Sequence, residues 1–60
     1  MLIKTEYANF GNPKDLLRYM QEENILECTV TCEYWGAKLL PMKMTQQDVK
    51  EWIQMGEEQQ

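Results

Sequence analysis

Within the segment 25–34, side chains from Leu26 onward alternate strictly between apolar and polar, and this pattern restricts the fold more than any other feature of the chain. One side carries Leu26, Cys28, Val30, Cys32 and Tyr34. The other side carries Glu27, Thr29, Thr31 and Glu33. A period of two is typical of a β-strand with one buried face. The segment therefore predicts a strand whose apolar side faces a core and whose polar side faces water.

Cys28 and Cys32, the only cysteines of the chain, lie on the apolar side of this predicted strand. Four strand residues span about 13 Å, whereas a disulfide requires Cα atoms within about 7 Å. The two thiols therefore cannot bond to each other. A zinc site needs four ligands, and the chain has no histidine, which leaves only a half-site shared between two subunits. We expect two small buried apolar side chains, without metal or cofactor.

The N-terminal third of the chain predicts a strand and then a helix. Residues 2–8 alternate in the same way and indicate a first strand. Asn12 and Pro13 supply an N-cap and a first-turn proline, which predict a helix over residues 13–23. Asn24 can adopt the left-handed conformation that ends a helix.

After the central strand the sequence predicts a tight turn at residues 35–37, where Gly36 supplies a positive φ. A third strand should follow over residues 38–44, with Leu40, Met42 and Met44 on one face. Pro41 has no N–H group, so one side of this strand should be irregular or partly unpaired.

A second helix is predicted over residues 46–55. Thr45 and Asp48 form a capping pair at its start, and Gly56 is expected to end it. Trp52 shares helical spacing with neighbouring apolar residues, which indicates that it belongs to the core.

Sixty residues allow a single domain with a thin core. We predict one α+β domain over residues 1–56, with a polar tail at 57–60 and both helices on one face of a three-stranded sheet. The first predicted strand can lie beside the third, antiparallel, or beside the second, parallel. We prefer the first arrangement, strand order 2-3-1, which resembles a ferredoxin-like fold that lacks its last strand. This resemblance of topology carries no functional information.

The charge and hydropathy of the chain exclude several classes of partner. The net charge is −4, and the six cations are scattered, so we expect no nucleic-acid binding. No apolar stretch approaches the roughly 20 residues of a membrane span, so we expect no membrane association. Two cysteines and the lack of an apolar leader favour a soluble cytoplasmic protein.

The residue types of the usual nucleophile and base pairs are incomplete in the sequence. It contains neither serine nor histidine, so a nucleophile has no imidazole base. The three glycines stand alone, and no phosphate-binding loop is formed. Glu27 and Glu33 lie six positions apart on a strand face without a cleft, which does not favour a catalytic carboxylate pair. We therefore expect no catalytic residues and no enzyme.

We expect instead a small acidic module or inhibitor that contacts another protein through its surface. The predicted partner-binding residues are Trp35 and Leu39, with the carboxylates of Glu27 and Glu33 beside them, because tryptophan is enriched at interface hot spots. The alternative for Trp35 is that it folds over the hairpin end and completes the core. The alternative function is mimicry of a nucleic acid, with binding to a nucleic-acid-binding protein.

The 2-3-1 order makes the first strand a sheet edge, and we hypothesise a homodimer through it. The edge consists of Ile3, Lys4, Thr5, Glu6 and Tyr7. Two antiparallel copies would set Lys4 of one chain against Glu6 of the other, which suits a twofold axis. The same two charges could equally keep the edge single.

Overall fold

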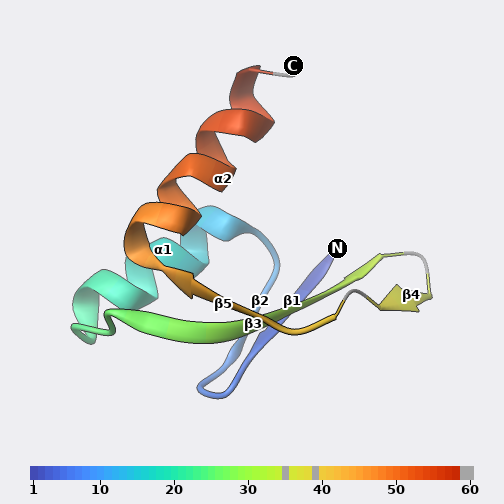
Figure 1. The fold of residues 1–60 in the computed structure, drawn as a ribbon, viewed down its shortest axis with the longest axis horizontal. Coiled ribbons are helices and arrows are strands. Elements are labelled where there is room, and N and C mark those ends of the chain that lie inside the picture. Colours follow the sequence, from blue (N-terminus) through green and yellow to red (C-terminus); the bar gives the residue numbers. More distant parts are fainter. Residues whose placement is uncertain (35, 39, 59–60) are drawn as a thin grey trace.

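The computed structural model describes residues 1–34, 36–38 and 40–58, so Trp35 and Leu39 lie outside the described part. Its elements are β1 (Leu2–Thr5), β2 (Asn9–Phe10), α1 (Pro13–Glu22), β3 (Glu27–Tyr34), β4 (Ala37–Lys38), β5 (Met42–Thr45) and α2 (Gln46–Glu58), shown in Figure 1. In the described residues the sheet is antiparallel and has five strands rather than the three predicted, because β2 follows the first predicted strand and the third is divided into β4 and β5. The two helices pack on this sheet. The predicted α+β class is confirmed, and the arrangement is consistent with a small ferredoxin-like domain.

The long strand β3 is the centre of the sheet, and its alternation follows the sequence. It pairs antiparallel with β1 on one side, where Cys32 lies opposite Ile3. On its other side it pairs with β5, where Cys28 lies opposite Met44, and with the short β4. The apolar side of β3 is buried at Cys28, Val30 and Cys32, as predicted. Two residues predicted on this side are not buried: Leu26 precedes the strand and is 80% exposed, and Tyr34, at the end of the strand, is also exposed.

The preferred strand order 2-3-1 is wrong, because the first predicted strand lies beside β3 and not beside β5. The chain reverses after Thr5, and β2 runs back along β1. Helix α1 therefore connects β2 with β3, which run parallel, and β1 fills the place between them. The alternative order assumed a parallel pairing of the first and second strands, and the pairing of β1 with β3 is antiparallel.

The hairpin turn between β1 and β2 is closed by a backbone hydrogen bond from the Thr5 N–H to the Ala8 carbonyl (3.0 Å), and the Thr5 hydroxyl reinforces it. Thr5 Oγ1 accepts hydrogen bonds from the N–H groups of Tyr7 (3.1 Å) and Ala8 (3.0 Å) and donates to the Ala8 carbonyl (2.8 Å). Side-chain bonds of this kind compete with a continuing strand. They explain why residues 2–8 do not form the single strand that their alternation predicts.

The predicted start of each helix is confirmed. Asn12 Oδ1 accepts the N–H of Asp15 at 2.9 Å, and Pro13 occupies the first turn of α1. Thr45 and Asp48 cap α2 reciprocally: Thr45 Oγ1 accepts the Asp48 N–H at 3.1 Å, and Asp48 Oδ2 accepts the Thr45 N–H at 2.9 Å. Asn24 has φ 56°, the left-handed conformation expected after α1.

The predicted end of α2 is wrong, because the helix continues through Gly56 to Glu58. A glycine ends a helix by adopting a positive φ. Of the described glycines only Gly36 does so, in the turn where the sequence predicts it.

The core lies between the sheet and the two helices, which cover the same face (Figure 1). Its buried residues are Ile3, Leu16, Met20, Cys28, Val30, Cys32, Met44 and Val49. Gln46 ties the start of α2 to the end of α1, because its amide donates to the carbonyls of Ile25 (2.9 Å) and Met20 (3.3 Å). Trp52, predicted as core, is only half-buried and packs against this cluster.

Candidate functional site

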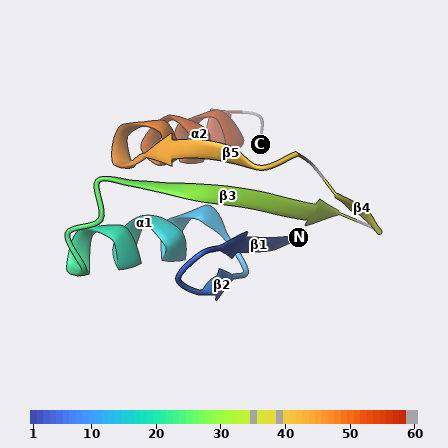
Figure 2. The same cartoon turned by 60° about the horizontal axis from the view of Figure 1, so that its bottom comes forward.

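The helices do not cover the whole inner face of the sheet. The eight residues of β3 extend for about 26 Å, whereas the ten residues of α1 extend for about 15 Å. Helix α1 lies alongside the first half of β3, and the strand continues beyond it toward β4 (Figure 2). Helix α1 therefore does not cover the end of the inner face that lies toward β4.

A groove of about 350 Å³ occupies this far end, between the sheet and α2. Its floor consists of alternate residues from β3 and from the β5 region: Val30, Cys32, Tyr34, Leu40, Met42 and Met44. Its wall consists of α2 residues at positions i, i+3, i+4 and i+7, which are Asp48, Glu51, Trp52 and Met55. One face of a strand pair and one stripe of a helix thus line the same depression.

The base of the groove is buried, and its rim is apolar and exposed. Val30 and Met44 belong to the core, whereas Leu40 is 87% exposed, Met42 60% and Met55 58%. Single exposed apolar residues are ordinary on protein surfaces, but a group of them around one depression is a candidate for an interaction site. Methionine adapts its shape to varied partners, which suits such a surface.

Two carboxylates lie at the wall of the groove. Asp48 accepts the Thr45 N–H, and Glu51 is exposed one turn further along α2. Within the described part of the chain, neither residue forms an ion pair. The apolar groove therefore has two carboxylates at its edge that no lysine or arginine of the described residues pairs with.

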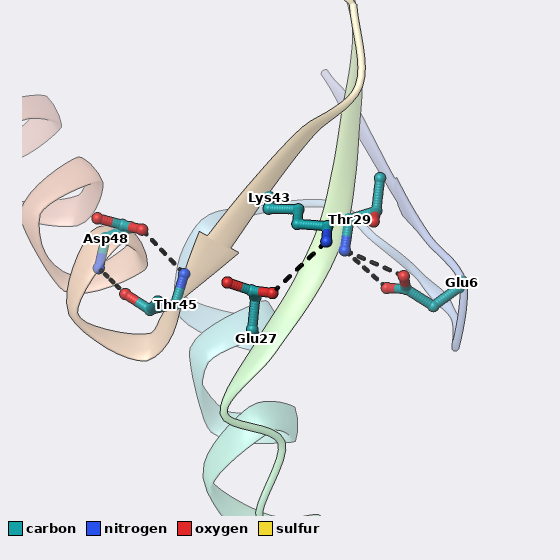
Figure 3. A network of polar contacts seen from close by, with 6 residues as sticks. All are labelled: Glu6, Glu27, Thr29, Lys43, Thr45 and Asp48. Carbon is teal, nitrogen blue, oxygen red and sulfur yellow. Dashed lines mark hydrogen bonds and ion pairs between the residues drawn. The ribbon is translucent and has the colours of Figure 1, made fainter.

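The opposite face of the sheet is polar and largely neutralised. Lys4 Nζ lies 3.3 Å from Glu33, and Lys43 Nζ lies 4.0 Å from Glu27, the pair drawn in Figure 3. Exposed pairs of this kind contribute about 0–1 kcal/mol each. The structure thus places Glu27 and Glu33, predicted to bind a partner, on the face away from the groove. Their role stays a prediction.

Beyond the end of β1, the side chain of Glu6 takes the place of a backbone hydrogen-bond acceptor for β3. Its carboxylate accepts the N–H of Thr29 at 2.8 and 3.1 Å through its two oxygens (Figure 3). This backbone hydrogen bond lowers the pKa of Glu6 below its usual value.

The predicted dimer edge is not an edge in this fold. Strand β1 has β2 on one side and β3 on the other, so Ile3 and Lys4 have strand neighbours in both directions. Ile3 is fully buried, and Thr5 lies at the hairpin turn. Tyr7 is exposed and contacts the ring of Tyr19. The homodimer itself stays a prediction, without this surface to support it.

Cys28 and Cys32 are free thiols in the core, which confirms their predicted burial. Burial raises the pKa of both thiols, so they stay protonated at neutral pH. Residues 1–34, 36–38 and 40–58 contain no group of three or more Cys, Asp or Glu side chains placed to hold a metal ion.

The alternation of the strands predicted that Tyr34, Leu40 and Met42 lie on the inner face, and that whole face was predicted to be core. The groove was therefore missed, although one signal was present: the alternating run of the central strand is longer than a ten-residue helix can cover. Asp48 and Glu51 gave no sign of their position, since both are typical of any solvated helix face.

In comparisons with protein families, curated proteins and solved structures, nothing matches this chain. None of the helices in its described part has the length and hydropathy to cross a membrane.

Proposed function

We propose that this chain is a non-enzymatic protein-binding module and that its docking surface is the groove between α2 and the strands β3 and β5. The observation that carries this proposal is the convergence of three strongly exposed apolar side chains, Leu40, Met42 and Met55, on one depression. These side chains are exposed to water in the fold. A partner that covers them would therefore stabilise the complex by about 25 cal/mol per Å² of apolar surface buried.

The lining of the groove supports binding rather than catalysis. Its ionisable groups are Cys32, Tyr34, Asp48 and Glu51. The Cys32 thiol is held protonated by burial, which raises its pKa, and Asp48 is already engaged with the start of α2. The chain has no histidine that could act as a base for any of them.

Mimicry of a nucleic acid stays the second prediction, with weaker support. A mimic needs unpaired carboxylates in an extended array, whereas Glu27 and Glu33 each have a lysine within 4.0 Å. Two free thiols fit a reducing compartment, so we expect the module to act in the cytoplasm.

The proposal is tested by photocrosslinking in the native host. A benzophenone side chain replaces Met42 in one variant and Leu26 in another, because Leu26 is also exposed and apolar but lies outside the groove. We expect residue 42 to capture a defined protein, and we expect an added Met55→Gln substitution to reduce that capture. Equal capture from residues 26 and 42, or no effect of Met55→Gln, would contradict the proposal.

A further inference from the structure

The backbone groups at the outer edge of β5 can be assigned from two hydrogen bonds. Thr29 directs its N–H toward β1, where Glu6 accepts it, so its partner Lys43 directs its own N–H and C=O away from β3. Thr45 follows the same alternation and directs its N–H outward, where Asp48 accepts it (Figure 3). Asp48 therefore lies at the outer edge of the sheet, and the groove opens there.

This edge is poorly suited to the addition of another strand. Pro41 has no N–H, and the Thr45 N–H is already used by Asp48. Lys43 is left as the one β5 residue able to exchange both backbone hydrogen bonds with an incoming strand. A short edge that carries proline and lysine is the usual protection against strand pairing. An extended peptide would thus form few backbone hydrogen bonds beside β5.

A helix fits the lining better. The wall residues Asp48, Glu51, Trp52 and Met55 form one stripe of α2, and the floor is an apolar sheet face. Helices α1 and α2 already pack together over the adjacent part of that face. A third helix laid over the exposed part, beside α2, would repeat the packing that forms the core.

The charge at the groove selects among helices. Asp48 and Glu51 are without ion pairs in the described part of the chain, and the net charge is −4. A second copy of this chain would bring its own two carboxylates to the same contact, because a twofold interface uses the same patch twice. A partner with lysine or arginine beside its apolar face would instead compensate them.

We infer that the groove binds an amphipathic α-helix of another protein, whose apolar anchors are spaced one turn apart and whose flanks are basic. This inference rests on the proposed function and specifies its partner. The anchors would contact Leu40, Met42 and Met55, and the basic flank would face Asp48 and Glu51.

The test uses two synthetic peptides of identical leucine and lysine composition. One has its leucines at helical spacing, and the other alternates leucine and lysine strictly, as a strand does. The readout is the NMR signal of isotope-labelled methionine methyl groups. Met42, Met44 and Met55 report on the groove, while Met1 and Met20 lie outside it and serve as internal controls.

We expect the helical peptide to shift the signals of Met42 and Met55 at a concentration at least tenfold lower than the alternating peptide. Glu51→Gln should weaken the binding of the helical peptide several-fold at low salt. Glu22→Gln, which removes an exposed helix carboxylate outside the groove, should not.

Equal or tighter binding of the alternating peptide would overturn the inference, and so would shifts spread evenly over all the methionines. Shifts that grow with the concentration of the protein alone would identify a second copy as the occupant and also overturn it. A third outcome is that neither peptide shifts the signals of the groove methionines while residue 42 still captures a protein in the host. In that case the inference of a helical partner is wrong, and the proposed protein-binding function is kept.

Discussion

Where the backbone hydrogen bonds between strands end in this small sheet, single polar side chains bind the remaining backbone groups. Glu6 accepts the Thr29 N–H that β1 is too short to reach, and Thr5 holds the turn that makes β1 short. Both residues were predicted to be ordinary strand positions. Alternation cannot distinguish them, because a threonine or glutamate has the same polarity whether it points to water or binds the backbone nearby.

Glu6→Gln should make the stability of the protein less dependent on pH. The Thr29 hydrogen bond lowers the pKa of Glu6 in the folded state, so this carboxylate stabilises the fold above the ordinary pKa of a glutamate. That contribution is lost as the pH falls through the lowered pKa. Glutamine keeps an acceptor but loses the charge that strengthens the bond. Urea midpoints at neutral and acidic pH check this.

The expected result is a lower midpoint for Glu6→Gln than for the wild type at neutral pH, with the gap narrowing in acid. Glu22→Gln serves as the control, because it also removes one negative charge, from the exposed face of α1. A gap that stays constant between the two pH values would show that the ionised carboxylate does not hold Thr29.

Among the secondary-structure elements, those with local signals were predictable and those set by distant contacts were not. The caps at Asn12 and Thr45 and the alternation of β3 depend on residues close together in the sequence, and the structure confirms them. The strand order depends on a reversal after Thr5 that has no proline or glycine to announce it. The end of α2 was misplaced because Gly56 ends a helix only when it adopts a positive φ, which it does not.

Thr45→Ala should reduce the free energy of unfolding by about 1 kcal/mol. The substitution removes the hydroxyl that accepts the Asp48 N–H and leaves the first turn of α2 without that bond. Urea denaturation measures the change, with Gln47→Ala as a control at an exposed position of the same turn. An unchanged midpoint for Thr45→Ala would mean that the cap contributes nothing to the fold.

For the molecule as a whole, a chain of sixty residues forms a core from two helices that leave part of the sheet uncovered. The alternation of the strands indicates which side chains face inward, including those of the groove floor. It could not show how far the helices extend over them, because that depends on how α1 and α2 pack in three dimensions. Trp35 and Leu39, predicted from the preference of large apolar residues for interfaces, lie outside the described residues.

Whether the groove serves binding and not folding is decided by the paired substitution Met42→Gln/Met55→Gln. Both side chains are exposed, so the urea midpoint should match that of the wild type. The dissociation constant for the partner captured through residue 42 should rise at least tenfold, which equals about 1.4 kcal/mol. Leu26→Gln, at an exposed apolar position outside the groove, should change neither quantity. An unchanged dissociation constant for the paired variant, or a fall in its midpoint that accounts for the lost binding, would contradict a binding role for the groove.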